Sequence, residues 1–270
     1  CVFGTDNLLI SSLISLKTVG LYSNYTLIIS QLSSLLTPVL NGIGASVGNL
    51  IATETKEKSY EIFNVTYFIN FWIYSICTIT LYNLIEPFID WAFGKNLLLN
   101  KLSLVLILCN FYLTGLRTSI NIFKSKAGIF SPDKYVPLLE ATINLVASLI
   151  LTRYLGLAGI FLGTTISTIS IPIWTQSKLV YNKIFDKSVF EYFKKYFIYL
   201  ILTLICALIT IELCSLIVIT NEFISLVVKG IICVVIPSII YLVVFFNTKE
   251  LKYIISICQP IIKKVALNYK

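Results

Sequence analysis

The sequence predicts an all-α, polytopic membrane protein with about eight transmembrane helices. Hydrophobic residues make up 57% of the 270 residues and charged residues 13%, whereas about a quarter of an ordinary soluble domain is charged. The apolar runs 198–219 and 224–246 each contain a single charge. About 20 apolar residues in a helix cross the ~30 Å hydrocarbon core of a bilayer. Lysine and arginine also gather in every second gap between the runs, as in multi-pass membrane proteins.

The predicted spans follow the apolar runs in chain order. The second run is longer than a bilayer requires and contains Pro38 and the glycine-rich stretch 41–44, so we expect a bend or an unwound turn there. Pro172 and Pro237 are expected to kink two later spans. The eight predicted spans cover residues 1–16, 21–51, 62–84, 102–123, 135–152, 157–180, 196–219 and 224–246.

The charges of the gaps predict the orientation of the chain. Fifteen lysines fall in the gaps on one side and in the C-terminal tail, whereas only four cations fall in the gaps on the other side. The positive-inside rule places the richer side in the cytoplasm. The tail is then cytoplasmic, and the first span runs from inside to outside. The four cations of the poorer side are Lys17, Lys95, Lys101 and Arg153.

Two further segments have the mixed composition of a membrane interface. Residues 86–94 combine two acids with Phe and Trp, so we expect them at the outer surface with the rings at headgroup depth. The tail, residues 247–270, is amphipathic, with Pro260 as a predicted break. We expect the tail either to rest on the anionic inner leaflet, where each lysine contributes about 1 kcal/mol, or to be solvated and partly disordered.

The composition argues against several kinds of chemistry. The chain has no His, which excludes a His-based catalytic base or metal site. It has no phosphate-binding loop and no nucleophile elbow, so we expect neither an enzyme nor a cofactor. The seven cysteines lack C-x-x-C spacing and are expected to be small buried hydrophobes. The net charge of +8 sits at membrane edges, which argues against nucleic acid as a partner.

Ionisable groups inside the spans are the candidates for function. An unpaired charge at the bilayer centre costs at least about 2.5–3.5 kcal/mol, so such a residue should face a water-filled cavity or a partner. Asp6 lies eleven residues before Lys17, about 16 Å of helix from the outer surface. We expect Asp6, followed by Asn7, to face a cavity; the alternative is a helix N-cap.

Arg117 lies seven residues before Lys124, about 10 Å from the cytoplasmic edge. Three roles are open: binding an anionic ligand through the guanidinium fork, pairing with an acid, or reaching the interface with its long side chain. Glu140 lies at a similar depth on the next span, so an Arg117–Glu140 pair is geometrically feasible. Asn144 follows Glu140 one helical turn later and should share its face.

Two kinds of helix–helix contact are also predicted. Glu212 and Lys229 occupy the last two spans and are expected to pair with each other. Gly-x-x-x-Gly motifs at 44–48 and 159–163 have the spacing that lets two backbones approach closely. We interpret both motifs as packing signals only.

Several segments together carry a resemblance to a known family. They are TDNLLIS at 5–11, VGLYSNYTLIISQL at 19–32, ASVGNLIATE at 45–54 and the long stretch 115–167. The most specific part is D-K-Y-x-P-L-x-E-A-x-x-N-L at 133–145. Over roughly residues 3–185 the chain resembles the second lobe of bacterial polysaccharide flippases of the Wzx type. These belong to the superfamily that also contains MATE multidrug exporters and the lipid II flippase.

The resemblance implies two six-helix lobes around a cavity that opens alternately to either side of the bacterial inner membrane. Residues 1–185 would form the second lobe, residues 186–246 two additional transmembrane helices and residues 247–270 the cytoplasmic tail. The chain has no Met and begins inside an apolar pattern without the layout of a signal peptide. We therefore expect it to be a fragment that lacks the first lobe.

The resemblance further implies a cargo of oligosaccharide carried on undecaprenyl diphosphate, with Arg117 neutralising the diphosphate. The expected partners are this lipid-linked oligosaccharide, membrane lipids and the polysaccharide assembly machinery. A proton or sodium gradient is expected to supply the energy, with Asp6 or Glu140 as the coupling acid. The predicted substrate-binding residues are Asp6, Asn7, Asn41, Arg117, Glu140 and Asn144.

Two other functions remain open. A drug or metabolite exporter of the same architecture would use the acids Asp6 and Glu140 for a cationic cargo. A membrane-embedded polysaccharide polymerase or transferase would need catalytic groups at a membrane surface, and Glu86 with Asp90 is the candidate pair of carboxylates for that role. Their spacing of four residues on an amphipathic segment favours a position facing solvent instead.

Overall fold

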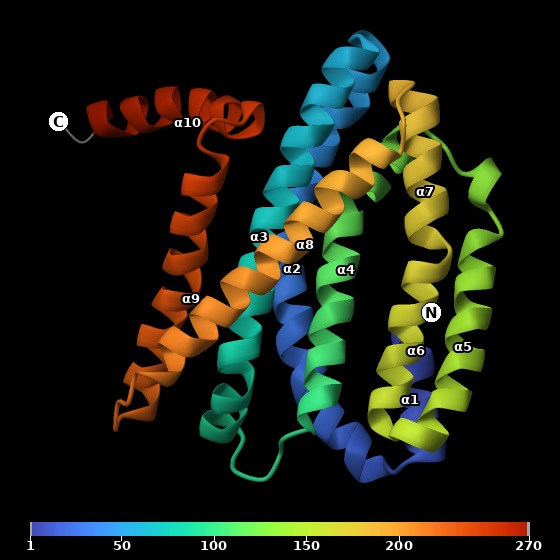
Figure 1. Ribbon diagram of the computed structural model, residues 1–270, viewed down its shortest axis with the longest axis vertical. Helices are drawn as coiled ribbons and strands as arrows, with labels where there is room; N and C mark the ends of the chain where they lie inside the picture. The colour runs from blue at the N-terminus through green and yellow to red at the C-terminus, as the bar shows by residue number, and fades with distance from the viewer. Residues whose placement is uncertain (1, 269–270) are drawn as a thin grey trace.

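The computed structural model describes the backbone of residues 2–268 and the side chains of residues 6–40, 42–257 and 259. Over that range every regular element is a helix, and most of the helices run up and down in one bundle (Figure 1). The all-α prediction is therefore confirmed. The helices are α1 (Val2–Leu13), α2 (Leu16–Thr53), α3 (Lys56–Ala92), α4 (Lys101–Lys126), η1 (Ser131–Asp133), α5 (Val136–Leu155), α6 (Leu157–Ser170), α7 (Pro172–Val180), η2 (Tyr181–Phe185), α8 (Phe190–Ser215), α9 (Glu222–Phe245) and α10 (Lys249–Asn268).

Seven helical stretches of the described chain are long and apolar enough to cross a membrane. They are α2, α3, α4, η1 with α5, the run from α6 to η2, α8 and α9. The predicted first span, residues 1–16, differs from the others. It corresponds to α1, which has 12 residues and is about 18 Å long, too short for a hydrocarbon core of about 30 Å. The described part of the chain thus has the character of a multi-pass membrane protein with seven candidate spans.

The prolines inside the predicted spans have different effects. Pro172 separates two helices, since α6 ends at Ser170 and α7 begins at Pro172. A proline disfavours helical geometry in the residue before it, and Ile171 has a φ of −126°. By contrast α2 is unbroken from Leu16 to Thr53, so the predicted unwound turn at Pro38 and 41–44 is wrong. Proline removes a single backbone hydrogen bond, and the remaining bonds of this long helix keep it continuous.

The ends of the helices separate by charge, as predicted. The loops that carry most of the lysines lie together at the top of Figure 1, where α2, α4 and η2 end and α3, α5 and α8 begin. We call this the lysine-rich end. The turns between α1 and α2, α3 and α4, α5 and α6, and α8 and α9 lie at the opposite, lysine-poor end.

The tail forms a helix that lies across the lysine-rich end. Figure 1 shows α10 almost at right angles to α9. Its backbone is helical from Lys249 to Asn268, so the predicted break at Pro260 is wrong. Leu251 is buried, and Lys195 of α8 donates a hydrogen bond to Glu250 Oε1 at 2.6 Å. These two contacts fix the start of α10 on the bundle.

The segment 86–94 also belongs to a helix. Residues 86–92 form the last turns of α3, which extends to Ala92, rather than a separate element lying flat on the membrane. Trp91 and Phe93 are exposed there, at the lysine-poor end. The continuous helix brings Glu86 near Lys101 at the start of α4, and their side chains form an ion pair of 3.1 Å.

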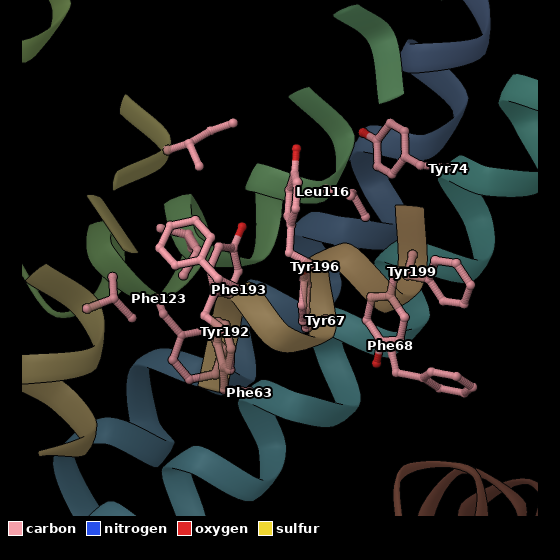
Figure 2. Packing of buried hydrophobic residues seen from close by; sticks show 14 of the residues in the cluster. Phe63, Tyr67, Phe68, Tyr74, Leu116, Phe123, Tyr192, Phe193, Tyr196 and Tyr199 are labelled. Carbon is pink, nitrogen blue, oxygen red and sulfur yellow. The ribbon is translucent and has the colours of Figure 1, made fainter. Parts of the chain in front are cut away.

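Aromatic side chains fill the core between α3, α4 and α8 (Figure 2). The rings of Phe71 and Tyr199 stack with their centroids 4.1 Å apart, and those of Tyr67 and Tyr192 stack at 5.1 Å. Such pairs contribute about 0.5–1.5 kcal/mol beyond their buried area. On α4, Gly115 leaves room for an α3 ring, because an added Cβ would lie 2.1 Å from the ring of Tyr74.

The Gly-x-x-x-Gly motif at 159–163 forms the close contact between α5 and α6. A Cβ on Gly159 would lie 2.4 Å from the carbonyl of Leu151, and one on Gly163 would lie 2.3 Å from Ser148 Oγ. Neither position has space for a side chain, which confirms the predicted packing role of this motif. The hairpin of α5 and α6 is consequently one of the tightest parts of the bundle.

A chain of hydroxyl groups attaches α8 and α9 to α3 and α4. Tyr112 of α4 shares a hydrogen bond of 2.8 Å with Thr203 of α8. The Thr203 hydroxyl donates to Ser75 Oγ of α3 at 3.0 Å, and Ser75 is also bonded to Tyr241 of α9. All four side chains are buried. Hydrogen bonds between membrane helices contribute about 0.6 kcal/mol each on average, so the chain specifies how the four helices dock.

Candidate functional site

Arg117 and Glu140, two of the predicted site residues, form an ion pair between α4 and α5. Arg117 Nη1 donates a hydrogen bond to Glu140 Oε1 across 3.3 Å. The two side chains are 15% and 16% exposed, so the pair is mostly enclosed. Both α4 and α5 pack on α6, and the pair links them directly. The predicted similar depth of the two residues is confirmed.

The guanidinium group of Arg117 has donors that the pair does not use. Its Nε is buried and has no hydrogen-bond partner among the described residues. A guanidinium group carries five N–H donors in a planar fork, and a buried donor without a partner costs about 1–3 kcal/mol. Arg117 can therefore bind a further acceptor, such as a phosphate oxygen or water, while it remains paired with Glu140.

Asp6 lies apart from this pair. It is the fifth residue of α1, so the alternative of an N-cap is wrong. Its side chain is 3% exposed, and Oδ1 has no hydrogen-bond partner in the described chain. Seven residues separate it from Leu13, about 10 Å of helix from the lysine-poor end, and α1 packs on α2, α5 and α6. Asn7 is exposed.

The remaining predicted site residues do not join the pair. Asn144 is buried, and its Nδ2 donates to Thr164 Oγ1 at 2.9 Å. It therefore fixes the contact of α5 with α6 and does not face an opening. The side chain of Asn41 lies outside the described residues, although its backbone belongs to α2.

The predicted pairing of Glu212 with Lys229 is wrong, because the described ion pairs do not include one between them. The face of α8 that packs on α9 carries Cys214, whose Sγ lies 3.8 Å from that of Cys233. Residues two apart on a helix point to different sides. Glu212 consequently faces away from α9 and is exposed.

A stripe of exposed small and polar residues runs along α2, and sequence reasoning did not single it out. Positions three and four apart share one face of a helix, and on this face of α2 the exposed residues are small or polar over almost the whole length. Leu27 is the one large apolar member among the described residues, and two further large apolar residues, Leu35 and Val39, are exposed along its edge beside Gln31 and Gly42. The α2 stripe consists of Gly20, Ser23, Leu27, Ser30, Gln31, Ser34, Thr37, Pro38, Gly42, Ala45 and Asn49.

The α2 stripe is poorly suited to contact with lipid tails. Several of its hydroxyls bond to the backbone of their own helix, as Ser34 does to the carbonyl of Ser30 at 2.9 Å. The amide of Gln31, in contrast, is exposed about 22 Å from the start of α2. Moving an amide from water to hydrocarbon costs roughly 4–8 kcal/mol when nothing replaces its hydrogen bonds. The stripe therefore requires water or a polar partner.

A cation lies beside the lysine-rich half of the α2 stripe. A Cβ on Gly48 would lie 3.7 Å from Lys126 Cδ, and one on Gly44 would lie 3.6 Å from Lys126 Cε. The side chain of Lys126 thus runs along α2 from Gly48 towards Gly44, away from the lysine-rich end. It forms no ion pair with a described acid. The glycine pair at 44–48 accommodates this lysine, in addition to packing against α4.

A pocket opens at the lysine-rich end of the described part of the chain. Its volume is about 310 Å³, and Glu54, Lys56 and Lys183 supply its charges. None of the six predicted site residues lines it. The structure therefore brings Arg117 and Glu140 together, buries Asp6 and Asn144 separately, and leaves the α2 stripe as the polar surface that is open to the surroundings.

The rival site for a transferase, Glu86 with Asp90, is not supported as a pair of free carboxylates. Glu86 is held by Lys101 in the ion pair at the start of α4. Asp90 lies instead at a shallow, open depression together with Lys95 and Asn96. Comparison of the chain with protein-family models, with curated proteins and with solved structures finds no match.

Proposed function

We propose that the chain is part of a transporter in which the α2 stripe lines a water-filled groove across the membrane. The observation that carries the proposal is the exposure of polar and small residues along a helix of 38 residues that is otherwise apolar enough to cross a bilayer. Polar groups at membrane depth are tolerated where they line an aqueous cavity or meet another polar surface. A groove used for transport satisfies this requirement.

The cargo that we propose is an oligosaccharide linked to a polyprenyl diphosphate, in keeping with the resemblance to polysaccharide flippases. Hydroxyl and amide groups such as those of Gln31 and Ser34 suit the hydroxyls of sugars. Lys126 and the unused donors of Arg117 suit a diphosphate. Leu35 and Val39 are exposed beside the α2 stripe, a surface on which lipid tails can remain in the bilayer. The lobe would rock to open the groove to either side.

The distribution of lysines supports a cytoplasmic position for the lysine-rich end and for α10. The membrane would be the bacterial inner membrane, where such cargo is transferred from the cytoplasmic to the outer leaflet. In this orientation the ammonium group of Lys126 lies near the cytoplasmic entrance of the groove. It would meet the diphosphate of the cargo first. Arg117 lies nine residues deeper and on the opposite side of α4, where it contacts Glu140, so its proposed contact with the diphosphate follows from the resemblance.

The test is transport of a fluorescent lipid-linked oligosaccharide by the full-length protein in liposomes. Ser34→Leu and Gln31→Leu should each lower flipping at equal reconstitution, because both place a bulky apolar side chain in the groove. Ser34→Ala is the matched control: it keeps a small residue and loses a hydroxyl that is already bonded within the helix, so flipping should persist. Full activity of both leucine variants would refute the proposed groove.

A second set of variants tests the identity of the cargo separately from the existence of the groove. Arg117→Ala and Lys126→Ala should reduce flipping of the diphosphate lipid, whereas Arg117→Lys should retain part of it. Undiminished flipping by both alanine variants would remove these cations from the mechanism. Efflux of a cationic dye by cells that express the full-length protein, without flipping of the lipid, would favour the drug exporter instead.

A further inference from the structure

A group of buried polar atoms without protein partners lies where α3, α4, α7 and α8 meet. Among the described residues, the hydroxyls of Tyr67, Tyr192 and Tyr196 make no hydrogen bond, although the three side chains are at most 6% exposed. Ser177 Oγ and Gln176 Oε1 of α7 are likewise buried and unpartnered. Buried polar groups in folded proteins nearly always have a partner, so this group of atoms needs an explanation.

The tyrosines that carry these atoms are packed against one another. The rings of Tyr67 and Tyr192 stack at 5.1 Å, and those of Tyr192 and Tyr196 lie 5.9 Å apart. Figure 2 shows the three tyrosines converging from α3 and α8, with the Tyr196 hydroxyl directed towards α4 near Leu116. Arg117 follows Leu116 on α4. The buried Nε of Arg117 belongs to the same set of unpartnered atoms.

The group continues towards the lysine-rich surface. The ring of Tyr181, another buried tyrosine with an unpartnered hydroxyl, lies 5.9 Å from that of Tyr192. The ring of Tyr60 lies 5.9 Å from that of Tyr181, and the Tyr60 hydroxyl donates to Glu191 Oε2 at 2.5 Å. Glu191 is exposed. Polar groups therefore follow one another from the surface at Glu191 to the Arg117–Glu140 pair.

The fold pairs buried hydroxyls completely in a neighbouring region. Tyr112, Thr203, Ser75 and Tyr241 bond to one another through direct contacts. These residues lie on the same set of packed helices as the unpartnered group, so direct pairing is available to tyrosines of this core. The Tyr192 hydroxyl lies near those of Ser177 and Tyr67 but does not reach hydrogen-bond geometry with either. The difference between the two regions indicates that the unpartnered group has a further partner other than protein.

We propose that the hydroxyls of Tyr181, Tyr192, Tyr196 and Tyr67 bind a chain of water molecules that connects Glu191 at the lysine-rich surface with Arg117 and Glu140. A buried water makes about three hydrogen bonds and satisfies polar groups that protein atoms do not reach. Donors and acceptors alternate along this route: hydroxyls serve as both, Gln176 Oε1 accepts and Arg117 Nε donates. Such a chain gives protons access to Glu140. This consequence for energy coupling rests on the proposed transport, whereas the water site itself is independent of it.

The test is X-ray radiolytic footprinting of the full-length protein, in which ionised bound water yields hydroxyl radicals that label adjacent side chains. The chain offers two matched pairs: Tyr192 and Tyr241 are both fully buried, and Tyr196 and Tyr112 are both 6% exposed. Tyr192 and Tyr196 should be labelled severalfold faster than Tyr241 and Tyr112, whose hydroxyls have protein partners. Equal labelling within each pair would overturn the proposal.

The variant Tyr192→Phe gives an independent readout. If the hydroxyl holds water, its removal should slow the labelling of Tyr196 severalfold and lower the melting temperature. If the site is dry, the variant removes an unpartnered hydroxyl and should raise the melting temperature without changing the labels, which would contradict the proposal. Neither measurement involves cargo, so a failure here leaves the proposed groove on α2 untouched, and loss of the groove leaves the water site untouched.

Discussion

Arg117 Nη1 and Glu140 Oε1 lie 3.3 Å apart and join two helices that the sequence connects by a short turn at the lysine-rich end. Removing one partner leaves the other charge enclosed and unpaired, which costs about 3–5 kcal/mol for a fully buried pair. Because this pair is slightly exposed, we expect Glu140→Gln to destabilise the protein by about 3 kcal/mol at most. Thermal unfolding of the purified protein in detergent measures this loss.

The double variant Arg117→Met with Glu140→Leu serves as the control for that prediction. Replacing both charges with apolar groups removes the unpaired charge, so the double variant should be more stable than either single variant. The coupling energy of the cycle should therefore be favourable. Additive losses would show that the two residues do not interact in the folded protein.

The contact of α5 with α6 depends on the absence of a side chain at Gly163. A Cβ there would lie 2.3 Å from Ser148 Oγ and 2.7 Å from the backbone nitrogen of the same residue. Gly163→Ala should force the hairpin apart and destabilise the protein by about 1–3 kcal/mol. The melting temperature and the recovery of monodisperse protein after gel filtration report the effect.

Gly42→Ala is the matched control for that substitution. A Cβ at Gly42 meets no atom within 4 Å, and alanine favours the helix over glycine by about 1 kcal/mol. Its melting temperature should equal or exceed that of the parent protein. A similar loss for both alanine variants would contradict the proposed role of close packing at Gly163.

The hydroxyl chain predicts how firmly α9 is attached to α3. Tyr241→Phe keeps the ring against Phe71 and removes the hydrogen bond with Ser75. A hydrogen bond between membrane helices contributes about 0.6 kcal/mol on average and up to about 1.7 kcal/mol, so a loss in this range is expected on thermal unfolding. Tyr154→Phe, at an exposed tyrosine of α5, should leave stability unchanged. Equal stability of the two variants would exclude a structural role of the chain.

The start of α10 should be released in acid. Burial alone would raise the pKa of the Glu250 carboxyl, but the hydrogen bond from Lys195 and the charges of Lys195 and Lys249 lower it below its usual 4.5. A carboxyl with a lowered pKa stabilises the folded state above its unfolded pKa and loses that contribution as the pH falls through its folded pKa. Docking of α10 should therefore weaken as the pH falls below 4.5.

Limited proteolysis of the tail measures the release of α10. Pepsin is suitable because it is active across this acidic pH range. Cleavage between α9 and α10 should accelerate as Glu250 is protonated. Glu250→Gln abolishes the titrating group, so its cleavage rate, normalised to that of an unstructured peptide at each pH, should already be high at about pH 5, where pepsin is still active, and change little as the pH falls further. A rate for the variant that rises with acid as steeply as that of the parent protein would assign the release to another group.

The sequence predicted those features that depend on neighbouring stretches of chain. Arg117 lies seven residues before Lys124 and Glu140 six residues after Lys134, so their meeting could be expected from the positions of the charges in the hydropathy pattern. The division of the helix ends into a lysine-rich and a lysine-poor end could be predicted from the positions of the lysines in the same way. Pro172 and Pro38 show the limit of prediction from local sequence. Both are prolines in apolar runs, but α2 remains a continuous helix at Pro38, whereas the helix is interrupted between α6 and α7 at Pro172.

Features that depend on distant stretches could not be predicted. The tyrosine group forms because α3, α7 and α8 converge beside α4, and no local pattern fixes that convergence. Glu212 faces away from Lys229 because Cys214 occupies the contact face of α8. The α2 stripe had a sequence signal, the recurrence of Ser, Thr, Gly and Ala every three to four residues. It could be recognised as a surface only once the exposure of each position was known.

The central claim is that the α2 stripe faces water, and cysteine accessibility tests it most directly. In a cysteine-free background of the full-length protein, Ser34→Cys should react rapidly with a charged, hydrophilic maleimide in intact membranes. Leu208→Cys is the reference, because Leu208 is exposed on the apolar face of α8 and should be shielded by lipid. Rapid labelling at position 34 with none at 208 is the predicted result. If position 34 is as unreactive as position 208, the stripe faces lipid or a dry interface and the proposed groove is wrong.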